Sequence, residues 1–438
     1  MAHRRGQEGQ ILVLGMILAA ALSLALLRYF STGQIVAAKT RQIHGLDAAA
    51  YSGALVQARS LNLLAYLNRA QLAHQLAMAH LVTLGSWALF GGAEAGQLLR
   101  GNPPAHLIGM LFGVDHGRAY LAAAQASGLH TQAQAQGTLG LAHAAHDRSV
   151  HQLYLGVSRD VVQTAESARM AAIRAVLQAH YPQHAQAELR LTLDQDQWPS
   201  LLRRHAPDHA LHELVQGIAS LYPILGPRNH SAQNTWAVDA RCPMLRHQLR
   251  RRGVTTLGAD GRWQATDTLS FHALRANRWV GCYYREYAMG WAWIPGHAGA
   301  AMGGAYSDAA PDDFSDQDFW RWVQSATDWG LLDQRDNPMA NSYARRDHPD
   351  WSSGGLAPYY DIATTRGEGT SGFELHLAID QPQGVTVHAH TAAQSYFARP
   401  QVRGDGYLET PNLYHPYWMA RLAPQLAAWD SVSGGLSR

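Results

Sequence analysis

ILVLGMILAAALSLALL, residues 11 to 27, is an uncharged and mostly apolar run. As an α-helix it would extend for roughly 25 Å, slightly less than a hydrocarbon core of ~30 Å. Gln10 and Arg28 can place their polar ends at the two interfaces, and Tyr29 and Phe30 also suit an interface. We therefore predict a transmembrane helix over residues 11–30.

The residues before this run set the expected orientation. His3, Arg4 and Arg5 precede it, and basic residues favour the cytoplasmic side. We expect residues 1–10 in the cytoplasm and everything after Arg28 in the periplasm, as in a single-pass protein of the bacterial inner membrane. A cleaved signal peptide is the main alternative, but the run is long for one and no A-x-A-like site follows promptly. A buried helix of a soluble protein fits less well, because the run has no polar face.

Composition limits the class of protein. The chain has 438 residues, enough for two or three domains, and 47% of them are hydrophobic, so a sizeable core can form. The formal net charge is only +2, which argues against a dedicated nucleic-acid-binding protein.

Proline and tryptophan divide the chain near Tyr181-Pro182, because nearly all of them follow that point. We predict a helical extracytoplasmic region over residues 31–180 and a mixed α+β extracytoplasmic domain over residues 181–438. The first helix is expected to continue from the membrane to about Gly91, with Gly101-Asn102-Pro103-Pro104 ending the block. A second helical stretch, residues 117–180, contains four glycines that weaken a helix, so we expect two or more helices there, folded back on the first as a helical bundle.

Strand signals are confined to the second part. LRLTLDQ (189–195) and FELHLAID (373–380) alternate apolar and polar residues, and QPQG (381–384) leads into VTVHAH (385–390) as a hairpin. Asp260-Gly261 predicts a second hairpin, and residues 279–293 are aromatic and strand-like. Residues 319–330 favour a short helix. Because there is no regular βαβ rhythm, the fold class is α+β.

Cys242 and Cys282 are the only cysteines. In an oxidising compartment they can form a disulfide, whereas in a reducing one they would be two small buried residues. The predicted periplasmic location favours the disulfide.

Histidines and aspartates are the candidates for a ligand site. His143 and His146 are three apart on a helix, and His388 and His390 share a strand face, yet neither pair has a further ligand at a recognised spacing. The acidic residues of SDAAPDDFSDQD lack the pattern of an EF-hand and suit an exposed loop before a helix; they are Asp308, Asp312, Asp313, Asp316 and Asp318. No nucleophile elbow, P-loop or dinucleotide fingerprint occurs. We expect no catalytic residue, no metal and no cofactor.

Two stretches resemble the N-terminal region of TadG-like proteins of the tight-adherence (Flp) pilus-assembly group. They are RRGQEGQILVLGMILAAALSLALL (4–27) and GLDAAAYSGALVQARSLNLLAYLNRA (45–70), the second containing a D-A-A-A-Y-S-G-A box. The resemblance implies a membrane anchor with a pilin-like helix and an extracytoplasmic domain. The D-x-S-x-S metal site of relatives with a von Willebrand A domain is absent, so metal-dependent adhesion is not implied.

The resemblance, together with the lack of a catalytic motif, thus implies a non-catalytic structural component of pilus assembly or of an associated secretion machine. Its expected partners are the lipid bilayer and other pilus-assembly or pilin-like membrane proteins, with no nucleic acid. The small residues Ala49, Gly53 and Ala54 would let a partner helix approach closely. The alternative is a membrane-anchored periplasmic enzyme or ligand-binding protein with a His/Asp site in the C-terminal half.

Overall fold

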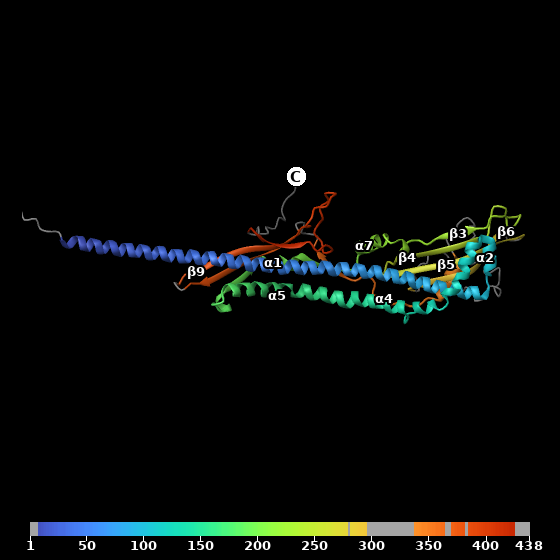
Figure 1. Ribbon diagram of the computed structural model, residues 1–438, viewed down its shortest axis with the longest axis horizontal. Helices are drawn as coiled ribbons and strands as arrows, with labels where there is room; N and C mark the ends of the chain where they lie inside the picture. Colours follow the sequence, from blue (N-terminus) through green and yellow to red (C-terminus); the bar gives the residue numbers. More distant parts are fainter. Residues whose placement is uncertain (1–7, 279–280, 296–336, 364–368, 382–383, 425–438) are drawn as a thin grey trace, which may run out of the picture. The chain divides into compact units, whose positions relative to one another are not determined.

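A computed structural model describes residues 8–278, 281–295, 337–363, 369–381 and 384–424 (Figure 1). Within them a long N-terminal helix is followed by a sheet-rich part, so the α+β layout is confirmed. The predicted helix at residues 319–330 and the acidic residues from Asp308 to Asp318 lie outside the described residues.

The first helix, α1 (Glu8–Arg100), is continuous over 93 residues. Its end follows from the sequence, since Gly101 adopts a left-handed φ of 63° and two prolines come directly after Asn102. The expected end at Gly91 was therefore too early. Gly91 is needed for packing, because a Cβ there would lie 2.8 Å from Cβ of Ala126.

Shorter helices fill most of the chain up to His180. They are α2 (Ala105–Phe112), α3 (Val114–Ala122), the 3₁₀ turns η1 (Ala123–Ala126) and η2 (Leu129–Ala133), α4 (Thr138–Arg148), the π-helical η3 (Ser149–Tyr154) and α5 (Leu155–His180). Gly113 and Gly128, with φ of 102° and 91°, separate successive helices. Gly128 lies inside the predicted second stretch, residues 117–180, and its positive φ explains one of the breaks in that stretch.

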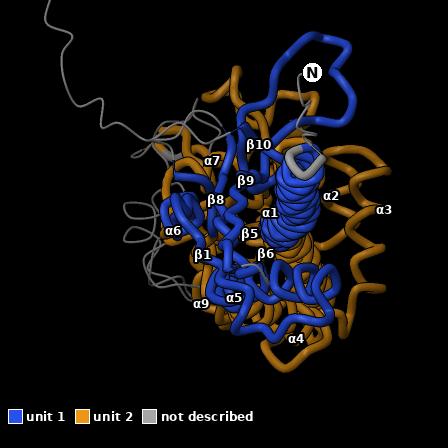
Figure 2. Tube along the Cα trace, turned by 90° about the vertical axis from the view of Figure 1, so that its left-hand side faces the viewer, with its two compact units in different colours: residues 1–68, 158–204, 360–438 blue, residues 69–157, 205–359 orange. Residues whose placement is uncertain are grey.

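The chain forms two compact units, coloured separately in Figure 2. Unit 1 contains residues 1–68, 158–204 and 360–438, and unit 2 contains residues 69–157 and 205–359. The predicted boundary at Tyr181-Pro182 marks the change from helices to strands, and each unit takes residues from both sides of it.

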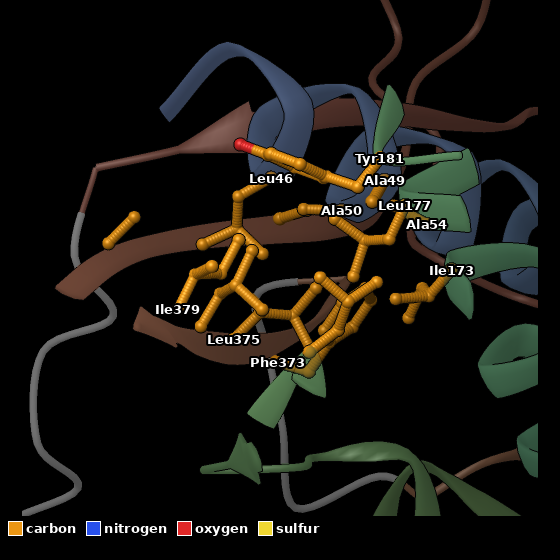
Figure 3. Close-up of a cluster of buried hydrophobic side chains, with 14 residues drawn as sticks. Leu46, Ala49, Ala50, Ala54, Ile173, Leu177, Tyr181, Phe373, Leu375 and Ile379 are labelled. Carbon is orange, nitrogen blue, oxygen red and sulfur yellow. The ribbon is translucent and has the colours of Figure 1, made fainter. Parts of the chain in front are cut away.

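Unit 1 contains a four-stranded antiparallel sheet of order β1-β8-β9-β10. The strands are β1 (Arg190–Asp194), β8 (Thr370–Asp380), β9 (Thr386–Phe397) and β10 (Trp418–Ala423). The apolar residues of the predicted alternation in β8, including Phe373 and Leu375, pack with α1 and α5 (Figure 3). The two opposite faces of β8 are therefore a core face and an outer face.

Polar side chains fix α1 to this sheet. Gln42 donates to the carbonyls of Leu377 at 2.7 Å and Val387 at 3.1 Å. Asn62 forms two hydrogen bonds with the backbone of Trp418, both 2.9 Å long. The amide nitrogen of Gln42 is buried and that of Asn62 is partly buried, and their hydrogen bonds to strand carbonyls define how α1 sits on the strands.

Unit 2 contains a second four-stranded antiparallel sheet, of order β3-β4-β5-β6. Its strands are β3 (His230–Gln233), β4 (Gln248–Leu257), β5 (Trp263–Asn277) and β6 (Gly281–Ile294). The hairpin predicted at Asp260-Gly261 joins β4 to β5, with Gly261 at a φ of 74°. Helix α9 (Pro338–Arg346) packs on β6 through a core that includes Ala288 and Tyr343.

The remaining elements are short. They are η4 (Gln186–Glu188), α6 (Trp198–Leu201), β2 (Leu202–His205), α7 (His209–Ala219), η5 (Pro223–Leu225) and β7 (Tyr359–Ile362).

Candidate functional site

The apolar start of α1 is exposed along its whole length. Every residue from Ile11 to Phe30 is exposed, and large side chains such as Ile17 and Leu18 are 61% and 62% exposed. Among the described residues, α1 is the one helix long and apolar enough to cross a membrane. A continuous apolar surface of this kind is typical of a site that lipid or protein covers.

The small-residue face of α1 is already occupied. Ala49 and Ala54 have no exposed surface, and they pack in the unit 1 core. A Cβ added to Gly53 would lie 2.8 Å from Cδ1 of Ile173 and 3.1 Å from Cζ of Phe373. These residues do serve close helix packing, but against α5 and β8 of the same chain. The expectation that this face receives another protein's helix is corrected accordingly.

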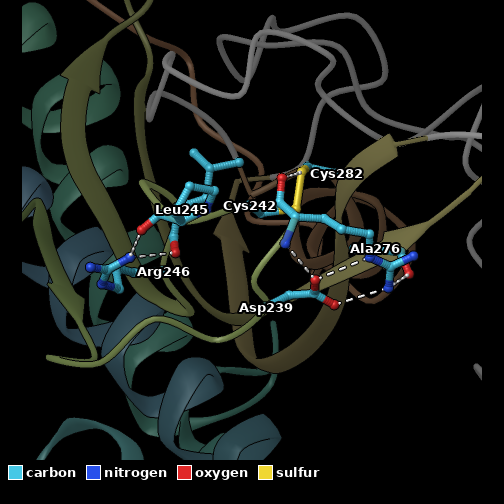
Figure 4. Close-up of a disulfide and its surroundings, with 8 residues drawn as sticks. Asp239, Cys242, Leu245, Arg246, Ala276 and Cys282 are labelled. Atoms are coloured by element: carbon cyan, nitrogen blue, oxygen red, sulfur yellow. Dashed lines mark hydrogen bonds and ion pairs between the residues drawn. A yellow bond between two sulfur atoms is a disulfide. The ribbon is translucent and has the colours of Figure 1, made fainter.

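A disulfide joins Cys242 and Cys282 in unit 2 (Figure 4). Their Cα atoms are 6.1 Å apart, and the bond connects the segment between β3 and β4 to the start of β6. Asp239 beside it accepts hydrogen bonds from the backbone and the side chain of Arg241. The bond closes a loop across a sequence separation of 40 residues.

The outer face of the unit 1 sheet gathers histidines and carboxylates. Strand alternation places Glu374 and His376 on the face of β8 opposite Phe373 and Leu375. Across the ladder His376 pairs with His390 of β9.

The distances show how closely these groups converge. The rings of His376 and His390 have centroids 5.0 Å apart, and Oδ2 of Asp194 lies 3.4 Å from Nε2 of His376. One potential ligand atom from each of Glu374, His376 and His390 lies within 4.8 Å of the other two. We call these three residues the Glu-His-His cluster. In the described part of the chain it is the one group of three such residues close enough to share an ion.

The two histidines predicted to share a face of β9 do share it, but they separate into different surroundings. His390 belongs to the cluster, whereas His388 faces Ala378 in the register. Asp380 lies nearby, and hydrogen bonds from Thr386 and Arg190 lower its pKa, with a smaller contribution from the charge of His388. The sequence correctly predicted that His390 lies on the outer face of β9, but not that His376 of β8 lies opposite it.

The helical pair also separates. His143 is buried beside Trp351, with ring centroids 5.2 Å apart, and burial lowers its pKa to about 4. His146 instead approaches His74, with their Nδ1 atoms 2.9 Å apart. Burial and the neighbouring His146 lower the pKa of His74. His143 is thus a core residue, and the pair does not form a joint ligand set.

Comparison with known proteins gives no relative: no family model, no curated protein and no solved structure matches this chain.

Proposed function

We propose that the protein is a membrane-anchored structural component of pilus assembly, or of an associated secretion machine, of the TadG-like kind. The observation that carries the proposal is the course of α1. Its exposed apolar part, residues 11–30, continues without a break into residues that are hydrogen-bonded to the sheet of unit 1.

This continuity supports an architectural role. Gln42, the first buried residue after Phe30 in α1, lies 12 residues beyond it, which corresponds to about 18 Å along a helix. A helix without a proline or a bulge over that distance holds a domain at a fixed height above a membrane. Residues 32–34 are exposed and remain open to neighbouring helices. Partners would be pilin-like membrane proteins that contact this short exposed part of α1.

The proposed topology places both cysteines in an oxidising compartment. We expect Cys242 and Cys282 in protein from native cells to resist alkylation until a reductant is added. An alkaline phosphatase fused after Asn102 should be active, and a fluorescent reporter that fails to fold after export should be dark there. Cysteines that are alkylated without a reductant, together with an inactive phosphatase fusion, would contradict a periplasmic location.

The proposed role is tested by deletion in the native cells. We expect the deletion to abolish surface pili while the prepilin remains present, and the full-length gene to restore them. A matched control is the Glu-His-His cluster variant His376→Gln/His390→Gln, which should also restore pili if the role is structural. A normal number of pili in the deletion strain would overturn the proposal.

The Glu-His-His cluster favours a second candidate, an anchored ligand-binding protein. Loss of function in the His376→Gln/His390→Gln variant at normal protein level would favour this candidate over the structural one.

A further inference from the structure

We propose that Glu374, His376 and His390 bind a divalent transition-metal ion of the Zn²⁺ class on the outer face of the unit 1 sheet. Two imidazoles and one carboxylate are donors that suit Zn²⁺, Cu²⁺ or Ni²⁺ rather than Ca²⁺ or Mg²⁺, which prefer oxygen alone. The inference is independent of the structural role, because it concerns a different surface from the apolar part of α1.

The backbone brings the three donors together. His376 and His390 are register partners on adjacent antiparallel strands, and Glu374 is two residues before His376 on the same face. Donors around a tetrahedral Zn²⁺ with bonds of 2.0–2.1 Å are about 3.3 Å apart. The three ligand atoms already lie within 4.8 Å of one another. Rotation of the two exposed histidine side chains is enough to close that difference.

The surroundings fit a metal-binding role. Glu374 is only 4% exposed, so its carboxylate is held by the fold, whereas both imidazoles are exposed and accessible to an ion. Asp194 of β1 pairs with Glu374 in the register and lies 3.4 Å from Nε2 of His376. A carboxylate beside an imidazole is the usual means of orienting a metal-binding histidine. Asp194 is therefore a positioning residue in this site.

The competing explanation is a pair of solvated surface histidines in a chain that has 24 of them. His388 distinguishes the two explanations. It lies on the same face of β9 as His390 and is also exposed, but the residue opposite it is Ala378, which offers no ligand atom. It belongs to no group of three potential ligands among the described residues. A metal site requires His390 and not His388, whereas incidental binding by surface histidines uses both alike.

An ion in this site would connect neighbouring strands. It would join β8 to β9, and three protein donors leave at least one coordination position open. Lys39 of α1 lines the same pocket as His376 and His390, and it donates a hydrogen bond to the carbonyl of His388. Lys39 lies nine residues after Phe30, or about 14 Å along the helix.

The test is a calorimetric Zn²⁺ titration of the untagged full chain in detergent. We expect one high-affinity Zn²⁺ per chain. His376→Gln and His390→Gln should each weaken binding by about tenfold or more, and Asp194→Asn by about tenfold without a change in stoichiometry. His388→Gln should change the affinity less than about twofold. Absence of stoichiometric binding to the wild type, or an equal loss in the His388→Gln variant, would overturn the proposal.

A second measurement does not depend on the variants folding. X-ray absorption at the zinc edge of the wild-type chain with one equivalent of Zn²⁺ should show two imidazoles and oxygen donors. A first shell without imidazole, or with one only, would refute the site. Near-UV circular dichroism of each variant shows whether a lost affinity reflects a lost ligand or a lost fold.

Discussion

Replacing Leu18 and Leu22 together by arginine is expected to release the protein from membranes. Both leucines are about 60% exposed on the apolar part of α1 and lie one turn apart on the same side. An arginine near the centre of a membrane helix costs about 2.5–3.5 kcal/mol, so the pair costs roughly 5–7 kcal/mol. Membranes washed with carbonate should retain most of the wild type and little of the variant.

The matched control is Val36→Arg/Thr40→Arg. It adds the same charges at the same spacing of four residues on the same helix, at positions exposed in unit 1 but outside the apolar segment. This variant should remain in the washed membranes. If both double variants stay bound to the wild-type level, the anchor is not residues 11–30.

Local patterns predicted the elements well. The alternation in FELHLAID gave β8 and its core face, and Asp260-Gly261 gave the hairpin between β4 and β5. These features depend on neighbouring residues alone, since a strand's faces and a tight turn are decided by a few consecutive side chains.

Apart from the Cys242–Cys282 disulfide, contacts between distant residues were not predictable. In the sequence, Gln42 and Asn62 have the pattern of ordinary polar residues on a helix. In the structure they form hydrogen bonds with strands more than 300 residues later. Periodicity shows which residues are apolar but not which backbone groups lack a partner. For the same reason we predicted that the face of Ala49, Gly53 and Ala54 contacts a helix of another protein. In the structure Ile173 and Phe373 of this chain cover that face.

The Glu-His-His cluster shows the same limit. The polar face of each strand could be predicted from the sequence. The pairing of His376 with His390 could not, because it depends on the register between β8 and β9. The register depends on the turn after Asp380, and a shift by one residue would reverse the face of every side chain in β9.

Removal of the Asp267 carboxylate is expected to destabilise unit 2 strongly. Asp267 has no exposed surface and accepts hydrogen bonds from Ser86 at 2.6 Å, from Arg251 at 2.7 Å and from Arg228 at 3.1 Å. Arg251 also stacks on Phe90, 3.7 Å from the ring centroid. Breaking a buried ion pair from one side costs about 3–5 kcal/mol, because the remaining charge loses its partner. Asp267→Ala should lower the free energy of unfolding by that amount in a urea titration of the detergent-solubilised chain.

The comparison with Asp380→Ala isolates the effect of burial. Asp380 also forms a bidentate ion pair, with Arg190 at 2.8 and 3.0 Å, but both side chains are more than half exposed. Water can replace the lost partner there, so the unfolding midpoint should stay close to that of the wild type. Adding Arg251→Met to Asp267→Ala should recover part of the loss, since it removes one of the two guanidinium groups left without the carboxylate. Equal midpoints for Asp267→Ala and Asp380→Ala would show that the buried charges do not stabilise the packing of α1 on β5.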